Sequence, residues 1–187
     1  LRSDLKITSI ETVHLAEFPA VIWVQVKTDS GHVGLGETFF GPRAVAGCVH
    51  EMFAPMLIGK DPLAIERHWR DMFDMANAFG YAGAEARAIS AIDIALWDLR
   101  GKILGVPAYT LLGGAHKTRL RVYANGWYTG GRSPEAFAQK AKETVARGYH
   151  ALKFDPFGTG LWELGRTERN LSLGIVEAVR DAVGPDV

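Results

Sequence analysis

The sequence predicts an α+β fold for residues 1–115, an antiparallel three-stranded meander with helices, followed at 116–187 by the first units of a parallel β/α array. Two observations support this fold class. Three segments of alternating apolar and polar residues, joined by short connections, lie within the first 40 residues. From about residue 119, strand-like and helix-like segments alternate singly along the chain, which is typical of a parallel sheet or a TIM-like (β/α) barrel.

The predicted strands of the meander span Ile7–Ala16, Val21–Thr28 and His32–Thr38. In the second strand, apolar residues recur at every second position, so one of its faces is apolar. A turn at 29–31, with the sequence Asp-Ser-Gly, joins the last two strands.

Three glycines in this region, at positions 31, 34 and 36, have the look of a glycine-rich nucleotide loop. That interpretation is rejected because the glycines lie in a hairpin and its return strand, not between a strand and a helix. No Lys-Ser or Lys-Thr pair follows them either. We therefore expect no nucleotide site here.

Two helices are expected after the meander. Pro42 precedes a helix predicted at Arg43–Leu57, and a second helix is predicted at Leu63–Met75. Asp61 is a suitable N-cap for the second helix because its carboxylate can accept a free amide hydrogen there. Pro62 suits the first helical position because it has no amide hydrogen to leave unpaired.

The longest predicted helix lies within the stretch 82–114. Its apolar residues recur at three- and four-residue steps and therefore share one face: Ala84, Ala88, Ala91, Ile92, Ala95, Leu96 and Leu99. Ile89, Ile94 and Ile103 add apolar side chains at the flanks, so we expect the helix to lie between two layers of the protein. Gly105 is expected to end it.

The second part of the chain contains two predicted strand–helix units. Strands at Leu120–Asn125 and Ala151–Asp155 alternate with helices at Ser133–Arg147 and Glu168–Val183. Two such units cannot close a barrel or cover both faces of a parallel sheet. Because the sequence reaches Val187 where a third strand is due, we expect the array to be truncated.

Composition and charge argue against several classes of partner. The 187 residues include 21 Lys and Arg and 21 Asp and Glu, so charge does not favour nucleic acid or an acidic membrane surface. No leader sequence or long apolar run is seen, from which we expect a cytoplasmic protein without a membrane partner. The single cysteine, Cys48, is interpreted as a buried thiol.

The candidate site lies at the ends of the two predicted parallel strands, where a (β/α) barrel builds its active site. Lys153 and Asp155 are two residues apart and so point to the same side of a strand. Their charges suit an oxygen-rich, charged substrate, with the ammonium binding a carboxylate; an ion pair that only orders the strand end is the alternative. The neighbouring Trp127 and Tyr128 form either a substrate platform or a packed wall.

Four sequence runs together resemble a known family. AISAIDIALWDLRGKILGVPAYTLLGG at 88–114 is similar to the signature helix and exit loop of the mandelate racemase–muconate lactonizing branch of the enolase superfamily. GHVGLGE at 31–37 resembles that branch's capping domain. VYANGWY at 122–128 and GYHALKFDPFG at 148–158 are most similar to its aldonate dehydratases, which act on gluconate, galactonate or related sugar acids.

The resemblance implies an α+β capping domain at 1–115 and the start of a (β/α) barrel at 116–187. It also implies a Mg²⁺-dependent hydro-lyase that removes the proton α to a carboxylate, passes through an enediolate and loses water to give a 2-keto-3-deoxy acid. The three carboxylate ligands of the metal, and the base, are expected on later strands, beyond Val187, so no metal ligand is expected in this chain. A sugar-acid substrate and a homo-oligomer are further expectations.

One departure from the branch bears on the reaction. Racemases and cycloisomerases of the branch carry Lys-x-Lys at the end of the second barrel strand, whereas this chain has Lys153-Phe154-Asp155. A racemase needs bases on both faces of the α-carbon, so the missing second base favours dehydration. Substrate specificity is expected from loops of the capping domain at 17–20 and 38–43. Thr38 and Arg43 are the candidates there, although Arg43 is equally interpreted as a solvent-facing residue at a helix start.

Other functions stay open at this point. Within the superfamily, the alternative is a sugar-acid epimerase, racemase or cycloisomerase. Outside catalysis, the chain is a fragment that serves as a binding module. The 187-residue chain alone is expected to be inactive.

Overall fold

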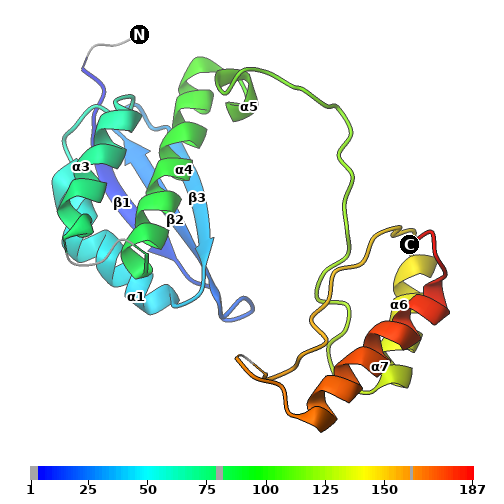
Figure 1. Ribbon diagram of the computed structural model, residues 1–187. Helices are drawn as coiled ribbons and strands as arrows, with labels where there is room; N and C mark the ends of the chain where they lie inside the picture. Colours follow the sequence, from blue (N-terminus) through cyan, green and yellow to red (C-terminus); the bar gives the residue numbers. More distant parts are fainter. Residues whose placement is uncertain (1–3, 79–81, 161) are drawn as a thin grey trace. The chain divides into compact units, whose positions relative to one another are not determined.

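The computed structural model describes residues 4–78, 82–160 and 162–187 (Figure 1). The chain divides into two compact units, Leu1–His116 and Lys117–Val187. The first contains a sheet and the helices up to α5, and the second contains α6 and α7.

The sheet of the first unit confirms the antiparallel meander. Its strands are β1 (Ile7–Val13), β2 (Val21–Thr28) and β3 (Val33–Phe39), in the order β1-β2-β3. The first strand is three residues shorter than expected because a turn begins after it, in which the amide of Phe18 donates to the carbonyl of Leu15 (3.0 Å).

Helices cover one face of this sheet. The helix expected at 43–57 is a continuous helical run of α1 (Pro42–Gly47), the π-helical η1 (Cys48–Phe53) and α2 (Ala54–Leu57). The apolar pattern did not indicate the π-helical turns. Within them, the His50 ring lies 2.9 Å from the Thr12 hydroxyl and so joins this run to β1.

Helix α3 (Ile65–Asn77) begins two residues later than expected, and Asp61 is not its N-cap. Instead, the Asp61 carboxylate accepts the amide hydrogen of Leu63 (2.9 Å) and closes a turn ahead of the helix. The backbone carbonyl of Asp61 accepts a hydrogen bond from the buried ring of His68 (2.6 Å), which anchors this turn to α3. Such a local side-chain turn competes with helix initiation.

Helix α4 (Ala84–Leu104) packs on β3 and β2, with α3 and α1 beside it (Figure 1). Its predicted apolar face is buried from Ala88 to Leu99, with Ala84 half-buried, and Gly105 ends the helix in the left-handed conformation (φ 68°). The expectation of protein layers on both sides is wrong for the described part of the chain, where Ile94 is 49% exposed. A short helix, α5 (Ala108–Leu111), follows.

The glycines of the third strand allow this close helix–sheet contact. A Cβ atom at Gly34 would overlap the carbonyl oxygen of Ala95, and one at Gly36 would overlap that of Ala91. Between the two glycines, the amide of Leu35 donates to the Asp98 carboxylate of α4 (2.8 Å). The glycine pattern is therefore a packing feature.

The second unit contains less strand structure than expected. The predicted strands at 120–125 and 151–155 reduce to one parallel bridge, Ala124↔Leu152. Its hydrogen bonds run from the Ala124 amide to Ala151 O and from the Lys153 amide to Ala124 O, both 2.9 Å. Strands of a parallel sheet are normally buried on both faces, and two segments alone bury too little to extend the ladder.

Helices α6 (Pro134–Ala146) and α7 (Arg166–Val183) pack against each other and run in the same direction (Figure 1). Ser133 caps α6 as its hydroxyl accepts the Ala136 amide hydrogen (3.2 Å), whereas α7 starts two residues before the expected Glu168. Their contact buries a small core of Phe137, Ala141, Ile175 and Val179. Among the described helices, none has the length and apolar character needed to cross a bilayer.

Candidate functional site

The parallel bridge brings the two predicted strand ends of the second unit together. Since both segments run in the same direction, Asn125 and Lys153 leave the bridge at the same end. The chain turns at Gly126 (φ 71°), and the indole N–H of Trp127 then donates to the carbonyl of Lys153 (3.0 Å). The main chain of Lys153 is thereby held from two sides, by Ala124 and by Trp127.

The side chain of Lys153 is exposed, and its ammonium nitrogen lies 5.8 Å from the centre of the Tyr123 ring. Among the described residues, no carboxylate lies within ion-pair distance of it. A cation over an exposed aromatic face is held by only about 0.5–1 kcal/mol, so the ammonium can move to bind an anionic ligand.

Asp155 closes a turn. Its carboxylate accepts the amide hydrogen of Phe157 (2.8 Å), two residues further on. The alternative of a Lys153–Asp155 ion pair is therefore not what the described residues show. Asp155 instead orders the loop that leaves the strand end, as side chains of this type do in turns.

The rings of Trp127 and Tyr128 are half-buried and belong to an aromatic cluster. Trp127 packs edge-on against Phe154 (5.4 Å between ring centres), and Tyr128 stacks on Phe137 (5.6 Å). These contacts are those of a packed wall behind the strand ends, which was one of the two interpretations of the pair.

The first unit carries the other two candidates, at the end of β3 and the start of α1. Thr38 is half-buried and pairs with Ile22 of β2. Arg43 is exposed in the first turn of α1. Between them, Phe40 (φ 73°) and Gly41 (φ 67°) both have left-handed backbone conformations, which are uncommon for phenylalanine and mark a specially shaped loop.

Sequence reasoning missed a residue that holds this loop. Arg87 of α4 donates from its guanidinium to the carbonyl of Phe39 (2.7 Å). The same guanidinium lies 5.4 Å from the ring centres of both Phe39 and Phe40. No local pattern marks Arg87, because its partners lie 47 and 48 residues earlier in the chain.

The single thiol has no features of a nucleophile. Cys48 is half-buried in η1, and burial raises its pKa, with the negative charge of Glu85 adding to the effect. A raised pKa leaves less thiolate at neutral pH, and thiolate is the reactive form.

Residues for a metal site do not converge in the part of the chain that the structure describes. Within it, no group of three His, Cys, Asp or Glu side chains could hold a metal ion. A hard cation such as Mg²⁺ needs several oxygen ligands, so the described residues do not by themselves fit one.

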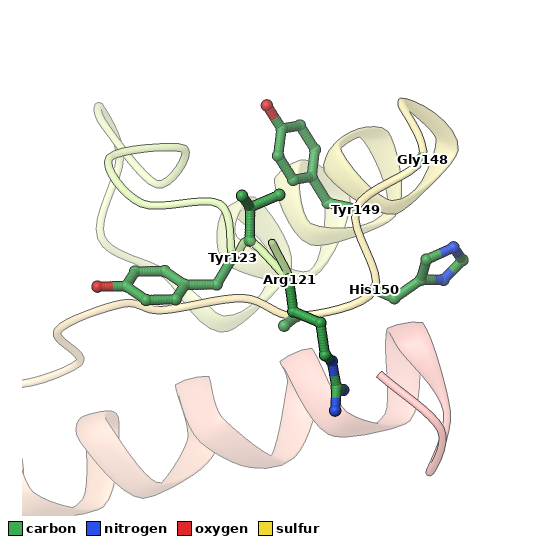
Figure 2. A pocket seen from close by; sticks show the side chains of 7 residues that line it. Arg121, Tyr123, Gly148, Tyr149 and His150 are labelled. Carbon is green, nitrogen blue, oxygen red and sulfur yellow. The ribbon is translucent and has the colours of Figure 1, made fainter. Parts of the chain in front are cut away.

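A cavity of about 390 Å³ lies at the other end of the bridged segments (Figure 2). Arg121, Tyr123, Tyr149 and His150 are among its lining residues. All of them precede the bridge in their segments, so the cavity opens toward the amino-terminal end of the bridge. In Figure 2 the polar ends of Tyr123, Tyr149 and Arg121 point away from one another, so they do not form a converging binding site.

Comparison with known proteins assigns the family. Residues 4–113 match the model of the mandelate racemase / muconate lactonizing enzyme N-terminal domain. The chain is 45% identical over 168 residues to D-gluconate dehydratase of Thermoproteus tenax, which covers 89% of this chain and 34% of that protein. It is 36% identical over 184 residues to D-galactonate dehydratase of Xanthomonas oryzae pv. oryzae, covering 96% of this chain and 46% of the relative.

Solved structures agree with this assignment. A member of the enolase superfamily from Salmonella Typhimurium superimposes with a TM-score of 0.86 at 34% identity, over 98% of this chain and 53% of that one. An enolase of the mandelate racemase subgroup from Agrobacterium tumefaciens gives a TM-score of 0.81 at 37% identity, over 97% and 48%. The chain thus spans about half the length of these proteins, or less. It belongs to the mandelate racemase and muconate lactonizing enzyme family of the enolase superfamily, and its residues 4–113 are the N-terminal domain of that family.

Proposed function

We propose that this chain is part of a sugar-acid dehydratase, a hydro-lyase that converts an aldonate into a 2-keto-3-deoxy acid. The observation that carries the proposal is the 45% identity, over 89% of this chain, to a D-gluconate dehydratase. Relatives named D-galactonate and D-xylonate dehydratase support the same substrate class. Because the chain spans less than half of these relatives, the activity is proposed for a longer protein that contains it.

Lys153 is the proposed electrostatic catalyst of this chain. Removal of the proton α to a carboxylate places additional negative charge on the carboxylate oxygens. The exposed ammonium of Lys153 binds that carboxylate and stabilises the developing charge, and this stabilisation is larger in the transition state than in the bound substrate. Asp155 shapes the adjoining turn and accepts a hydrogen bond from a substrate hydroxyl.

Four further residues are proposed to contact the sugar chain. Thr38 and Arg43 flank the specially shaped loop after β3 and supply a hydroxyl and a cation for polar substrate groups. Trp127 and Tyr128 pack behind the strand end, where the indole N–H of Trp127 donates to the carbonyl of Lys153. In this role Tyr128 contributes its hydroxyl, since aromatic residues of this kind have an apolar body and a polar tip.

Mg²⁺ is proposed as the cofactor of the longer protein. The described residues lack the three converging carboxylates that such an ion requires, so its ligands are proposed to lie outside this chain. When bound, the ion would supply electrophilic stabilisation of the substrate carboxylate. A homo-oligomer in the cytoplasm, without nucleic-acid or membrane partners, completes the proposal.

The decisive experiment uses the full-length protein with D-gluconate, D-galactonate and D-xylonate in D₂O, with Mg²⁺ present. We expect at least one substrate to lose one water and give a 2-keto-3-deoxy product. Proton NMR and mass spectrometry detect this product. An epimerised sugar acid that retains all its hydroxyl groups would contradict dehydration and favour the epimerase alternative. Substrate binding without any turnover would favour a binding module.

A further inference from the structure

Arg132 reaches the loop that follows Lys153, from a position just before α6. Its Nη2 atom donates to the backbone carbonyl of Pro156 (2.6 Å), and its Nη1 atom forms an ion pair with Glu168 at the start of α7 (2.7 Å). One guanidinium therefore joins the loop at 155–158 to the amino-terminal turn of a helix. Two separate N–H donors on a planar group fix both distance and direction, which a lysine ammonium cannot do.

Ser172 of α7 supports the same carbonyl. Its buried hydroxyl lies 3.0 Å from Pro156 O and 2.8 Å from the carbonyl of Glu168, and it accepts from Nη2 of Arg132 (3.2 Å). Pro156 is itself buried. A carbonyl removed from water and contacted by both an arginine and a serine is held in one place.

The loop also wraps around the arginine stem. Gly158 adopts a left-handed conformation (φ 62°), and a Cβ atom there would lie 2.7 Å from Nε of Arg132. Nε is buried and has no hydrogen-bond partner among the described residues, so the loop and not solvent surrounds this part of the side chain. The loop at Gly158 therefore packs directly against the side chain of Arg132.

We propose that the contacts of Arg132 with Pro156 and Glu168 form a clamp on the loop at 155–158, and that Arg132 is thereby a positioning residue for Lys153. Ala124 and Trp127 hold the main chain of Lys153 directly, and Arg132 holds the chain three residues further on, at Pro156. These contacts fix the backbone position of Lys153, and this limits where its ammonium can lie when it binds the substrate carboxylate. This role toward substrate rests on the proposed dehydratase function.

The first test is hydrogen exchange in the full-length protein. Arg132→Lys keeps the charge but loses the fork, so the amides of Phe157 and Gly160 should exchange at least tenfold faster. Arg180→Lys is the matched control, because Arg180 also donates to two carbonyls (Gly184, 2.5 Å, and Val187, 2.9 Å) but at the far end of α7. Unchanged exchange at Phe157 and Gly160 in Arg132→Lys would overturn the clamp.

A second variant protects this test against misfolding. Should Arg132→Lys fail to fold, Ser172→Ala removes the serine hydroxyl from Pro156 O and leaves the arginine in place. It should still accelerate exchange at Phe157, by a smaller factor than the loss of the arginine fork. Exchange equal to that of the unmodified protein in Ser172→Ala would then count against the clamp.

The second test is a double-mutant cycle on dehydratase activity. A small displacement of a catalytic group can cost up to about 10²-fold in rate, so Arg132→Lys should lower kcat/KM by about 10–10²-fold. If Arg132 acts through Lys153, the same substitution should have almost no further effect in a Lys153→Ala background. Additive losses in the cycle would overturn the positioning role.

The two tests separate the inference from the proposed function. Faster exchange without any sugar-acid turnover by the unmodified protein would refute the dehydratase and with it the role toward substrate, while the clamp itself would stand. Turnover by the unmodified protein with additive losses would refute the positioning role and leave the dehydratase intact.

Discussion

Lys153 has a fixed main chain and an ammonium that forms no ion pair with the described residues. Its amide and carbonyl both form hydrogen bonds, to Ala124 and Trp127, whereas its ammonium lies over the face of Tyr123, 5.8 Å from the ring centre. A fixed main chain that carries an exposed, mobile ammonium is the arrangement expected of a residue that binds an anionic ligand. A structural lysine would be paired with a carboxylate or buried along its stem.

Lys153→Ala in the full-length protein tests this role. Because the charge matters more as negative charge develops, the substitution should lower both kcat and kcat/KM, by about 10²–10³. Lys142→Ala, which removes an exposed lysine from α6, is the matched control and should leave both constants unchanged. Steady-state kinetics on folded variants make the comparison. Near-normal kcat and kcat/KM in Lys153→Ala would refute the assignment.

Asp155 should tolerate one substitution better than another. Asn retains an oxygen that can accept the Phe157 amide hydrogen, whereas Ala removes the acceptor from this turn. We therefore expect Asp155→Asn to cost less in kcat/KM than Lys153→Ala, and Asp155→Ala to add a loss of about 1 kcal/mol in the free energy of unfolding. Kinetics and urea denaturation measure the two effects. Equal stability of the Asn and Ala variants would show that the turn does not depend on this carboxylate.

At the scale of elements, the contact of β3 with α4 depends on the absence of side chains at two positions. Gly36→Ala would place a methyl group on the carbonyl of Ala91, so the helix or strand must shift. Overpacking of this kind costs about 1–3 kcal/mol. Urea denaturation should therefore show a lower free energy of unfolding for this variant.

Gly47→Ala is the matched control for this substitution. Gly47 has helical dihedral angles (φ −56°, ψ −50°), and no atom lies within 4 Å of a Cβ built there. Alanine should stabilise the helical run by up to about 1 kcal/mol, since glycine is the poorer helix former. A stabilised Gly36→Ala variant, or equal effects at both positions, would contradict the close packing of β3 and α4.

Asp93 of α4 should make stability depend on pH. Burial raises its pKa, and the negative charge of Glu66 on α3 adds to the effect. The native state then binds the proton more tightly than the unfolded chain. The free energy of unfolding contributed by this group therefore falls as pH rises above the unfolded pKa of about 3.9.

Asp93→Asn should consequently be more stable than the unmodified protein at pH 7, by less than about 1 kcal/mol because the side chain is partly exposed. The difference should vanish below about pH 4.

Glu11→Gln should show the opposite sign. A hydrogen bond from Lys27 lowers the pKa of Glu11, so this variant should be less stable than the unmodified protein at pH 7 and equally stable at low pH. Thermal melts across pH measure both, and a pH-independent gap for Asp93→Asn would contradict the prediction.

At the scale of the whole molecule, the chain spans less than half the length of relatives that are named dehydratases. Chelation of divalent metals from the full-length protein should abolish dehydratase activity, and added Mg²⁺ should restore it.

The 187-residue chain by itself should show no activity. Calorimetry should also show no micromolar, stoichiometric Mg²⁺ binding by this chain, because its described residues lack a converging ligand set. Tight Mg²⁺ binding by the chain alone would overturn this assignment of the ligands.

Local sequence patterns determined most of the elements of this protein. Alternation of apolar residues predicted the three strands of the meander, and Ser133 and Gly105 marked helix ends where the structure has them. These signals succeed because strand faces and helix caps depend on residues within a few positions of one another. The pair Lys153 and Asp155 was likewise found from its place at a predicted strand end.

Only the tertiary structure decided what brings distant segments together. Arg132 lies 24 residues from Pro156, and Arg87 lies 48 from Phe39, so neither contact leaves a local pattern. The glycines at 34 and 36 likewise owe their role to a helix about 60 residues later. The predicted strands at 120–125 and 151–155 shrank to a single bridge because a parallel ladder depends on neighbours on both sides, which a local apolar pattern does not supply.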